Sequence, residues 1–222
     1  MCGRYTLITT SSVFQRFDID SADKGIDLKT SYNVSPGSYM PTVTGGAKNE
    51  LNLMKWGLIP SWAKDPAIGY KMINARADTV TVKPAYKKCF QKQRCLVPAS
   101  GFFEWKKFGE TKKPFYIKLK NEDLFSFAGL YDVWKDAEEK EIVSFTIITT
   151  EANSVVENIH DRMPVILTRE EEGMWLNKLT DEKTLLKLLD PFESKGMETY
   201  EVSTLVNNAR NDNADLIEEV EK

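Results

Sequence analysis

The sequence predicts an α+β protein of one domain over residues 1–222, with a mainly antiparallel, barrel-like β-sheet core flanked by helices. Short runs with the alternation and residue types of β-strands dominate the chain. Helical patterns are fewer and mostly late. The two kinds of segment do not alternate regularly, which argues against a doubly wound parallel sheet.

Seven segments have the pattern of strands. They are residues 4–9, 51–58, 94–97, 102–105, 114–120, 124–134 and 142–149. Proline and glycine are scattered between them as turn residues, and no repeat or low-complexity tract interrupts the chain. The pattern therefore offers no boundary at which to divide the chain into two domains.

The helices are predicted from their end signals. Thr168-Arg169-Glu170-Glu171 has the form of a capping box, which predicts a helix that runs through Trp175. A second helix is expected to begin near Thr180 and to end before Pro191, because proline cannot continue a helix. Shorter helices are predicted at Ser11–Phe17, Pro84–Gln91 and Glu151–Ile159.

The composition excludes several classes of protein. No stretch reaches the roughly 18 to 20 apolar residues that span a bilayer, and no signal peptide is recognisable, so we expect a cytoplasmic protein. The three cysteines are an odd number, and no Cys-x-x-Cys pair accompanies the single histidine. We therefore expect no disulfide framework and no metal site, with Cys89 and Cys95 as small buried residues.

Positive charge is concentrated in the first part of the chain. Residues 1–120 carry 20 Lys and Arg against 9 Asp and Glu, a net of +11, and residues 121–222 carry 10 against 24, a net of −14. Together these give the −3 of the whole chain. Such asymmetry favours a polyanion-binding surface, although a solvated lysine-rich face would give the same pattern.

Cys2 becomes the N-terminal residue if Met1 is removed, which the small size of cysteine permits. It then carries an α-amine with a pKa of about 7.7 to 8.0 and a thiol with a pKa of about 8.5, both partly nucleophilic at neutral pH. The amine can condense with an aldehyde to a Schiff base, and the tethered thiol can close on the imine carbon to give a thiazolidine. Taken alone, a cysteine at position 2 can also be accidental.

Glu104 and His160 are candidate acid–base residues. Glu104 lies among aromatic residues in Phe102-Phe103-Glu104-Trp105, where desolvation raises a carboxyl pKa; the alternative is a surface position on an edge strand. His160 is the only histidine and lies in a compact polar segment that ends at a proline. An imidazole can transfer protons at neutral pH, but a structural role for it stays open.

Asn74 and Arg76 are candidate ligand-binding residues. In an extended segment they share one face with Asp78, where an amide can bond a sugar hydroxyl and a guanidinium suits a phosphate. Aromatic residues interleaved with Lys and Arg suit single-stranded nucleic acid, and each could equally belong to the core. Three tryptophans lie in this basic part of the chain: Trp56, Trp62 and Trp105.

Six segments stand in the order of one known family. They are Met1–Tyr5, Tyr32–Gly37, Trp56–Pro60, Ile73–Asp78, Gly101–Trp105 and His160–Pro164. With these segments the chain resembles the SRAP family, named for SOS response-associated peptidases, from residue 2 to about residue 210. A chance match of six ordered motifs is very improbable.

The resemblance implies an abasic-site processing protein. Cys2 would form a thiazolidine crosslink with the ring-opened aldehyde of an abasic site in single-stranded DNA, shielding the site during replication. Glu104 would be the acid–base residue, and Asn74 and His160 would position the sugar and assist ring opening. Arg4, Arg76 and Arg162 would meet phosphates, and Trp62 would pack against a base. The family is also credited with lyase activity and with peptidase-like removal of its initiator residue. No cofactor, metal or membrane is implied, and we expect a monomer.

Two other functions remain open from the residues alone. In an N-terminal-nucleophile hydrolase, the Cys2 thiol would attack an amide with its own amine as base. In a non-catalytic reader of damaged or modified DNA, Arg76, Trp62 and the basic part of the chain would suffice. Only the first interpretation, abasic-site processing, requires a stable covalent product between Cys2 and DNA.

Overall fold

The computed structural model describes residues 2–19, 26, 28–46 and 48–220. The strands in these ranges are β1 (Arg4–Leu7), β2 (Ser31–Val34), β3 (Tyr39–Thr44), β4 (Glu50–Trp56), β5 (Asn74–Arg76), β6 (Arg94–Ala99), β7 (Gly101–Phe108), β8 (Thr111–Leu119), β9 (Phe125–Lys135), β10 (Glu141–Glu151), β11 (Arg162–Pro164), β12 (Ile166–Leu167) and β13 (Met197–Glu201). The α-helices are α1 (Val13–Arg16), α2 (Pro84–Lys92), α3 (Arg169–Leu176) and α4 (Glu182–Lys187), with short 3₁₀ turns between elements.

Five strands close into a barrel. Their order is β10, β4, β3, β6 and β9, and β9 pairs again with β10 to complete the ring. All of these pairings are antiparallel except that of β4 with β10. Strands β5, β11 and β12 extend the barrel at its margins, with β5 parallel to β10. Closure pairs the strand edges that would otherwise be exposed.

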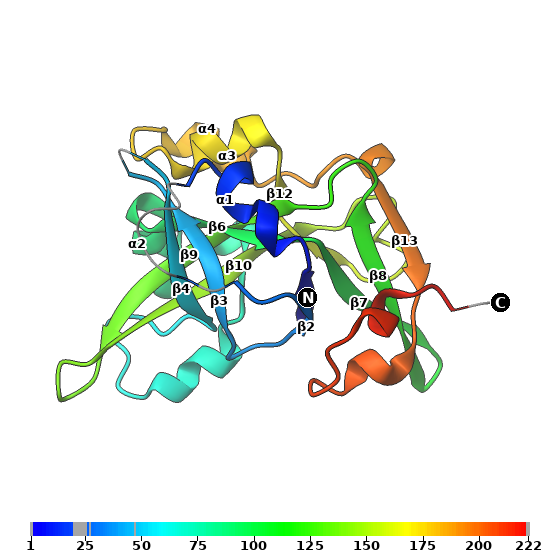
Figure 1. Cartoon of the computed structure of the whole chain (residues 1–222). Helices are drawn as coiled ribbons and strands as arrows, with labels where there is room; N and C mark the ends of the chain where they lie inside the picture. Colours follow the sequence, from blue (N-terminus) through cyan, green and yellow to red (C-terminus); the bar gives the residue numbers. More distant parts are fainter. Residues whose placement is uncertain (1, 20–25, 27, 47, 221–222) are drawn as a thin grey trace.

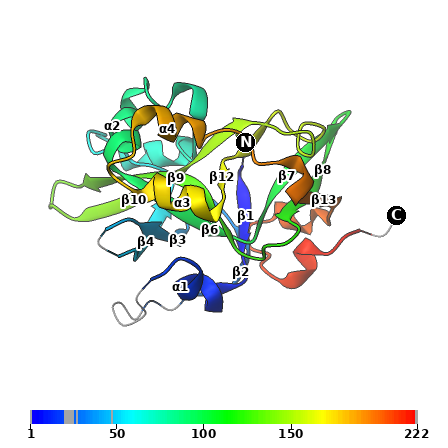
Figure 2. The same cartoon turned by 90° about the horizontal axis from the view of Figure 1, so that it is seen from above.

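The second sheet is antiparallel throughout and has the order β13, β8, β7, β1 and β2. Its strand β1 lies between the barrel and the outer strands of this sheet (Figure 1; Figure 2). The chain thus places its first strand where side chains from both sheets can meet.

The helices cover the barrel because each presents one apolar side. Helix α2 begins with a proline in its first turn and buries Tyr86, Cys89 and Phe90. Helix α3 buries Trp175, whose indole Nε1 donates to the Cys95 carbonyl at 3.0 Å. In Figure 1, α3 and α4 lie along the upper side of the barrel.

The apolar core has two parts. The larger fills the barrel and includes a stack of Trp56 on Phe145, with ring centroids 6.4 Å apart, and Tyr5 edge-on to Trp56 at 5.2 Å. The smaller joins the second sheet to the C-terminal segment through Phe103 and Tyr116. The C-terminal residues are therefore held against the outer face of the sheet that carries β1.

The α+β class and the barrel-like, mainly antiparallel core are confirmed. The capping box of α3 is present, with Thr168 Oγ1 accepting from the Glu171 N–H and the Glu171 carboxylate accepting from the Thr168 N–H. Helix α4 begins at Glu182 behind an Asp181 cap, slightly later than predicted. The segment Ser11–Phe17 contains only a short 3₁₀ turn followed by α1.

The prediction of a helix at Glu151–Ile159 is wrong. Glu151 ends β10, and residues 154–159 form turns. Asn153 Oδ1 accepts from the N–H groups of Val155 and Val156, as at a helix N-terminus. The segment is nevertheless too short for a helix of the predicted length, because Glu151 still belongs to β10 and pairs with Arg162 of β11.

Six strands were not predicted: β2, β3, β5, β11, β12 and β13. Three of them, β5, β11 and β12, have three residues or fewer, too few to show an alternation. Strand β3 contains Pro41, which normally counts against a strand. These strands exist because neighbouring strands supply their partners.

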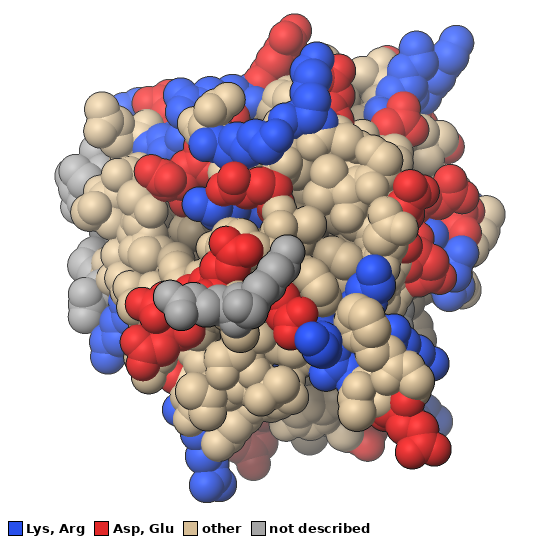
Figure 3. All heavy atoms as spheres, turned by 90° about the vertical axis from the view of Figure 1, so that its right-hand side faces the viewer, with Lys and Arg blue, Asp and Glu red and all other residues tan. Residues whose placement is uncertain are grey.

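The charge asymmetry does not turn the second sheet into a basic face. Lysines of β8 form ion pairs with glutamates of β13, Lys113 with Glu201 at 2.8 Å and Lys118 with Glu198 at 3.0 Å. Figure 3 shows blue and red side chains interleaved on this side of the molecule. In the part of the chain described, no helix is long and apolar enough to cross a membrane.

Candidate functional site

Cys2 and Asn74 form the centre of the candidate site, where β1 begins. Cys2 is completely buried, and its backbone carbonyl accepts a hydrogen bond from Asn74 Nδ2 at 2.8 Å. Asn74 opens β5, which is held in place because it pairs with β10. A carbonyl can only accept, so the contact identifies the amide nitrogen, and the other amide atom is the oxygen. Asn74 Oδ1 is buried and has no hydrogen-bond partner within the described ranges.

Glu104 approaches the same place from the second sheet. Strand β7 pairs with β1 so that Arg4 lies opposite Phe103, and the adjacent Glu104 is 2% exposed. Burial raises the pKa of the Glu104 carboxyl, and the nearby imidazole of His160 acts on this pKa in the opposite direction. The aromatic neighbours therefore produce the desolvated carboxyl that the sequence predicted, and the alternative of a surface position is wrong.

The Cys2 thiol is held in its neutral form. Its pKa is raised first by burial and second by the negative charge of Glu104. Its Sγ lies 3.8 Å from the Arg4 carbonyl, the weak contact expected of an S–H donor. The Glu104 carboxyl is thus close enough to affect the protonation of Cys2, although more than a hundred residues separate the two in the chain.

His160 follows the turns of residues 154–159 and is partly exposed. Two groups compete for its Nδ1: the Arg162 N–H donates to it at 3.0 Å, and the Asp161 carboxylate lies 2.7 Å away. The first contact fits a neutral ring with its proton on Nε2, and the second fits a protonated ring. The position of Nδ1 between a backbone N–H and a carboxylate lets it act as an acceptor or a donor, depending on which of the two it bonds.

Arg76 and Arg162 lie on either side of β10. Thr149 of this strand is opposite Arg76 of β5, and Glu151 is opposite Arg162 of β11. Arg76 is exposed and forms an ion pair with Asp78, with Nη2 and Oδ2 2.6 Å apart. Arg162 is buried, donates to the Thr149 carbonyl and has its pKa lowered, first by burial and next by Arg76. The two guanidinium groups therefore differ in how freely they can reach a phosphate.

Arg4 is directed toward the C-terminal segment. Its Nη1 donates to Asn33 Oδ1 and to the Val206 carbonyl, both at 2.7 Å, and its Nη2 donates to the Asn207 carbonyl at 3.3 Å. Asn33 Nδ2 in turn donates to the carbonyls of Val206, Asn208 and Asn211. This network of Arg4, Asn33 and residues 206–211 holds the start of β1 in position.

Asn33 and residues 206–211 were not among the site residues predicted from the sequence. Asn33 lies within one of the six motifs, which was the available signal for it. No sequence pattern could identify residues 206–211 as part of this network, because they contribute backbone carbonyls, which every residue has. Trp105 also contacts this segment, since its Nε1 donates to Asn207 Oδ1 at 2.7 Å.

Trp62 stands apart from the buried residues. It is 61% exposed and lines a surface depression together with Lys64, Ile68 and Lys71. Trp56, by contrast, is buried in the barrel and donates from Nε1 to the Ile73 carbonyl at 3.0 Å. Of the tryptophans in the basic part of the chain, Trp62 therefore has the most exposed ring.

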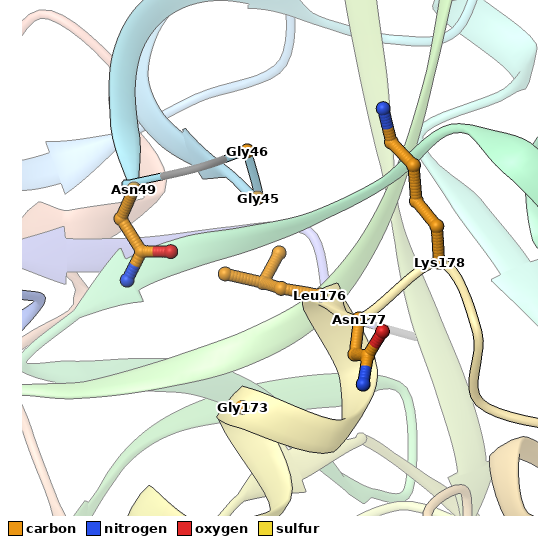
Figure 4. A pocket seen from close by; sticks show the side chains of 7 residues that line it. All are labelled: Gly45, Gly46, Asn49, Gly173, Leu176, Asn177 and Lys178. Carbon is orange, nitrogen blue, oxygen red and sulfur yellow. The ribbon is translucent and has the colours of Figure 1, made fainter.

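A second depression lies between the β3–β4 connection and the end of α3 (Figure 4). Gly45, Gly46, Asn49, Gly173, Leu176, Asn177 and Lys178 line it, and Lys178 is the one charged residue among them. It contains no carboxylate or thiol and shares no residue with the site at Cys2. No group of three or more His, Cys, Asp or Glu side chains in the described ranges could hold a metal ion.

The fold therefore brings Cys2, Asn74 and Glu104 together at the start of β1, with His160 electrostatically coupled to Glu104. We call these four residues the Cys2 cluster. Arg76 and Arg162 lie along the neighbouring strands, Arg4 is bound to the C-terminal segment, and Trp62 is on an exposed loop. A buried neutral thiol beside a desolvated carboxyl and an imidazole can support nucleophilic addition with local proton transfer.

Comparisons with known proteins identify the family and the relatives of this chain. The family model described as SOS response associated peptidase (SRAP) matches residues 1–209. Abasic site processing protein YoqW of Bacillus subtilis is 48% identical over 98% of this chain and 99% of its own length. Abasic site processing protein HMCES of Xenopus tropicalis is 36% identical, covering 82% of this chain and 63% of its own.

A solved structure shows the same fold. A protein from Bacteroides thetaiotaomicron superimposes with a TM-score of 0.90 at 33% identity, over 99% of this chain and all of its own. A protein from Bordetella bronchiseptica, 19% identical over 91% of this chain and all of its own, has the same fold with a TM-score of 0.77. The chain belongs to the SRAP family.

Proposed function

We propose that this SRAP-family protein forms a covalent thiazolidine crosslink between Cys2 and the ring-opened aldehyde of an abasic site in single-stranded DNA, in the cytoplasm. The observation that carries the proposal is the burial of Cys2 beside Glu104, with its backbone held by Asn74. Relatives with the name abasic site processing protein support the choice of substrate. The proposal requires removal of Met1, which lies outside the described residues.

The crosslink forms in two steps. The α-amine of Cys2 adds to the aldehyde carbon, and loss of one water gives an imine. The thiol sulfur then adds to the imine carbon while the S–H proton moves to the imine nitrogen, closing a five-membered ring. No oxidant or cofactor is consumed. The raised pKa of the thiol supports this order, because a neutral thiol leaves the first attack to the amine.

Glu104 and His160 would move the protons of these steps. Dehydration of the first adduct needs a proton on the departing oxygen, and a carboxyl with a raised pKa can hold one near neutral pH. The imidazole of His160, which is electrostatically coupled to the Glu104 carboxyl, can return a proton to this carboxyl after each transfer. Hydrolysis by the reverse steps would account for slow reversal of the crosslink, and elimination from the imine would give lyase activity.

Asn74 would hold the amine in the reacting position. Its Nδ2 fixes the Cys2 carbonyl, and its Oδ1 is a buried acceptor that has no partner in the described ranges. An acceptor so placed can receive a hydrogen bond from the free α-amine of Cys2 or from a sugar hydroxyl. A correctly oriented nucleophile accounts for a large part of the rate of such reactions.

The exposed cations would bind the DNA strand. Arg76 can exchange its exposed Asp78 partner for a phosphate, since surface ion pairs contribute little. Trp62 offers an exposed ring to an adjacent base. We also propose that Arg162 and Arg4 bind phosphates. Both guanidinium groups already donate to backbone carbonyls, so they can move less than Arg76 and would bind only a phosphate that comes close to them.

Intact-mass measurement tests the proposal. The purified protein should lack the mass of Met1, and incubation with abasic single-stranded DNA should add the mass of the oligonucleotide less one water. Cys2→Ala should retain non-covalent binding and form no adduct. Equal adduct formation by Cys2→Ala on a denaturing gel would refute the mechanism.

The same measurement distinguishes the two other functions. An N-terminal-nucleophile hydrolase would release a cleaved amide and form no stable DNA adduct. A non-catalytic reader would bind abasic DNA without any Cys2-dependent covalent product. Peptidase-like removal of Met1 by the protein itself predicts that Cys2→Ala retains Met1 when expressed in cells lacking methionine aminopeptidase activity.

A further inference from the structure

The hairpin formed by β7 and β8 carries lysines and an exposed phenylalanine that the proposed chemistry does not use. Lys106, Lys107, Lys112 and Lys113 flank its turn, and Phe108 is 45% exposed. In Figure 1, β7 and β8 run together toward the lower right, away from the barrel. The hairpin begins at the strand that contributes Glu104 to the Cys2 cluster.

The pairing register places part of this hairpin on the same face as Glu104. Successive side chains of a strand point to opposite faces, so Glu104, Lys106 and Phe108 share one face of β7. Lys113 lies opposite Lys106 and shares that face. The ring of Phe108 confirms the arrangement, because the Nζ atoms of Lys106 and Lys113 lie 5.5 and 5.4 Å from its centroid. We call Lys106, Phe108 and Lys113 the Phe108 platform.

The other two lysines occupy the opposite face. Lys107 lies opposite Lys112, and both are exposed. The hairpin thus contains two cross-strand lysine pairs of the same composition, one on each face. Like charges directly opposite each other destabilise a hairpin, so neither pair is explained by the stability of the fold.

The Phe108 platform differs from an ordinary solvated pair of lysines. Two ammonium groups share one aromatic ring, which concentrates positive charge beside an exposed apolar surface. Lys106 has no carboxylate partner in the described ranges, and Lys113 pairs with Glu201, which is partly exposed. Exposed cation–π and ion-pair contacts are each weak, so both ammonium groups can exchange their partners for a phosphate.

We propose that the Phe108 platform binds the single-stranded DNA that continues from the abasic nucleotide on one side. Its ammonium groups hold a phosphate, and the ring of Phe108 packs against the unpaired base of the same flank. The inference rests on the proposed function, which puts the abasic sugar beside Glu104. Strand β7 rises about 3.3 Å per residue, so Phe108 is roughly 13 Å along the strand from Glu104, a distance that a short stretch of extended DNA spans.

The experiment compares variants of the two faces of the hairpin. Lys106→Gln/Lys113→Gln removes two charges from the platform, and Lys107→Gln/Lys112→Gln removes two from the opposite face as the matched control. Phe108→Ala removes the ring without a change in charge. Each variant is assayed for the rate of adduct formation at subsaturating concentrations of two abasic oligonucleotides, one extended only on the 5′ side of the abasic site and one only on the 3′ side.

We expect Lys106→Gln/Lys113→Gln to slow adduct formation about tenfold with one of the two oligonucleotides. The steepness of log affinity against log salt concentration should fall by about 0.7, the value for the loss of one phosphate contact with a single strand. Phe108→Ala should slow the same reaction about fivefold or more, as expected for the loss of one stacked base. The control pair should change either rate less than twofold. The melting temperatures should stay close to that of the unmodified protein, because the exposed charge contacts that are lost each contribute less than about 1 kcal/mol.

Equal rates for the platform pair and the control pair, or an equal defect with both oligonucleotides, would overturn the inference. The first result would mean that only net charge matters, and the second that the platform does not follow one flank of the strand. If the unmodified protein forms no adduct, the proposed function fails instead. Binding of an undamaged oligonucleotide, measured by fluorescence anisotropy, then still decides whether the platform contacts single-stranded DNA.

Discussion

The Arg16–Glu172 pair and the Cys2 cluster are both buried polar groups, and they differ in how completely their atoms are paired. Arg16 donates to the two carboxylate oxygens of Glu172 at 2.7 and 2.9 Å, and its Nε donates to the Leu124 carbonyl. Ser126 adds a further donor to Glu172 at 2.7 Å. Every nitrogen of the guanidinium and both oxygens of the carboxylate have a partner.

Around the Cys2 cluster, several buried polar atoms have no partner in the described ranges. These atoms are Asn74 Oδ1, Tyr5 Oη and Arg162 Nε. An unsatisfied buried polar atom costs about 1 to 3 kcal/mol of stability. The Arg16–Glu172 pair is thus complete as part of the fold, whereas the unpaired atoms around Cys2 fit the proposed binding of a further molecule there.

Removing one partner of the Arg16–Glu172 pair should have the largest effect on stability. Glu172→Ala leaves a buried guanidinium without its carboxylate and is expected to lower the free energy of unfolding by about 3 to 5 kcal/mol. Urea denaturation measures this loss. Glu170→Ala, in the same turn of α3 but exposed, is the control and should lower it by less than about 1 kcal/mol. Similar losses for both variants would contradict the assignment of the pair to structure.

Replacing Asn74 should separate activity from stability. Asn74→Ala removes one hydrogen bond to the Cys2 carbonyl, which should cost about 1 kcal/mol of unfolding free energy, but it should slow adduct formation at least about tenfold. Asn49→Ala is a matched control, because Asn49 also donates from Nδ2 to a backbone carbonyl, that of Phe17, at 2.8 Å, and lines the depression away from Cys2. If both variants form the adduct at the same rate, Asn74 has only a structural role.

Glu104→Gln is expected to have the smallest effect on the free energy of unfolding, and to raise it instead of lowering it. Burial raises the pKa of the Glu104 carboxyl above the ordinary value of 4.5, so the folded state disfavours the carboxylate. Stability is therefore lost as the pH rises from 4.5 through the raised pKa, and the neutral amide lacks this loss.

Unfolding measured across this pH range provides the check. Glu104→Gln should match the unmodified protein below pH 4.5 and be more stable above it, although its adduct formation is slowed. A stability difference that does not change with pH would show that burial does not raise the pKa of the Glu104 carboxyl. Glu104 would then resemble the Arg16–Glu172 pair rather than the rest of the Cys2 cluster.

Local patterns in the sequence predicted a good part of the fold. The long strands, such as β9 and β10, have the residue pattern of a strand over many residues, and a capping box marks the first turn of α3. The segment after β10 was predicted as a helix, but Glu151 still pairs with Arg162 of β11, and only turns fit between these two strands. Short strands such as β5 could not be predicted, since a partner strand and not their own pattern creates them.

Within the candidate site, the sequence alone identified the reactive residue types and, through six motifs, the family. Only the tertiary structure decided how these residues are used. It brought Asn74 and Glu104 to Cys2 from different sheets, and it engaged Arg4 with the C-terminal segment. The physical reason is that residue chemistry and short-range periodicity are properties of the local chain. Burial, pairing and pKa depend on the register and closure of strands that are distant in sequence, and no local pattern contains them.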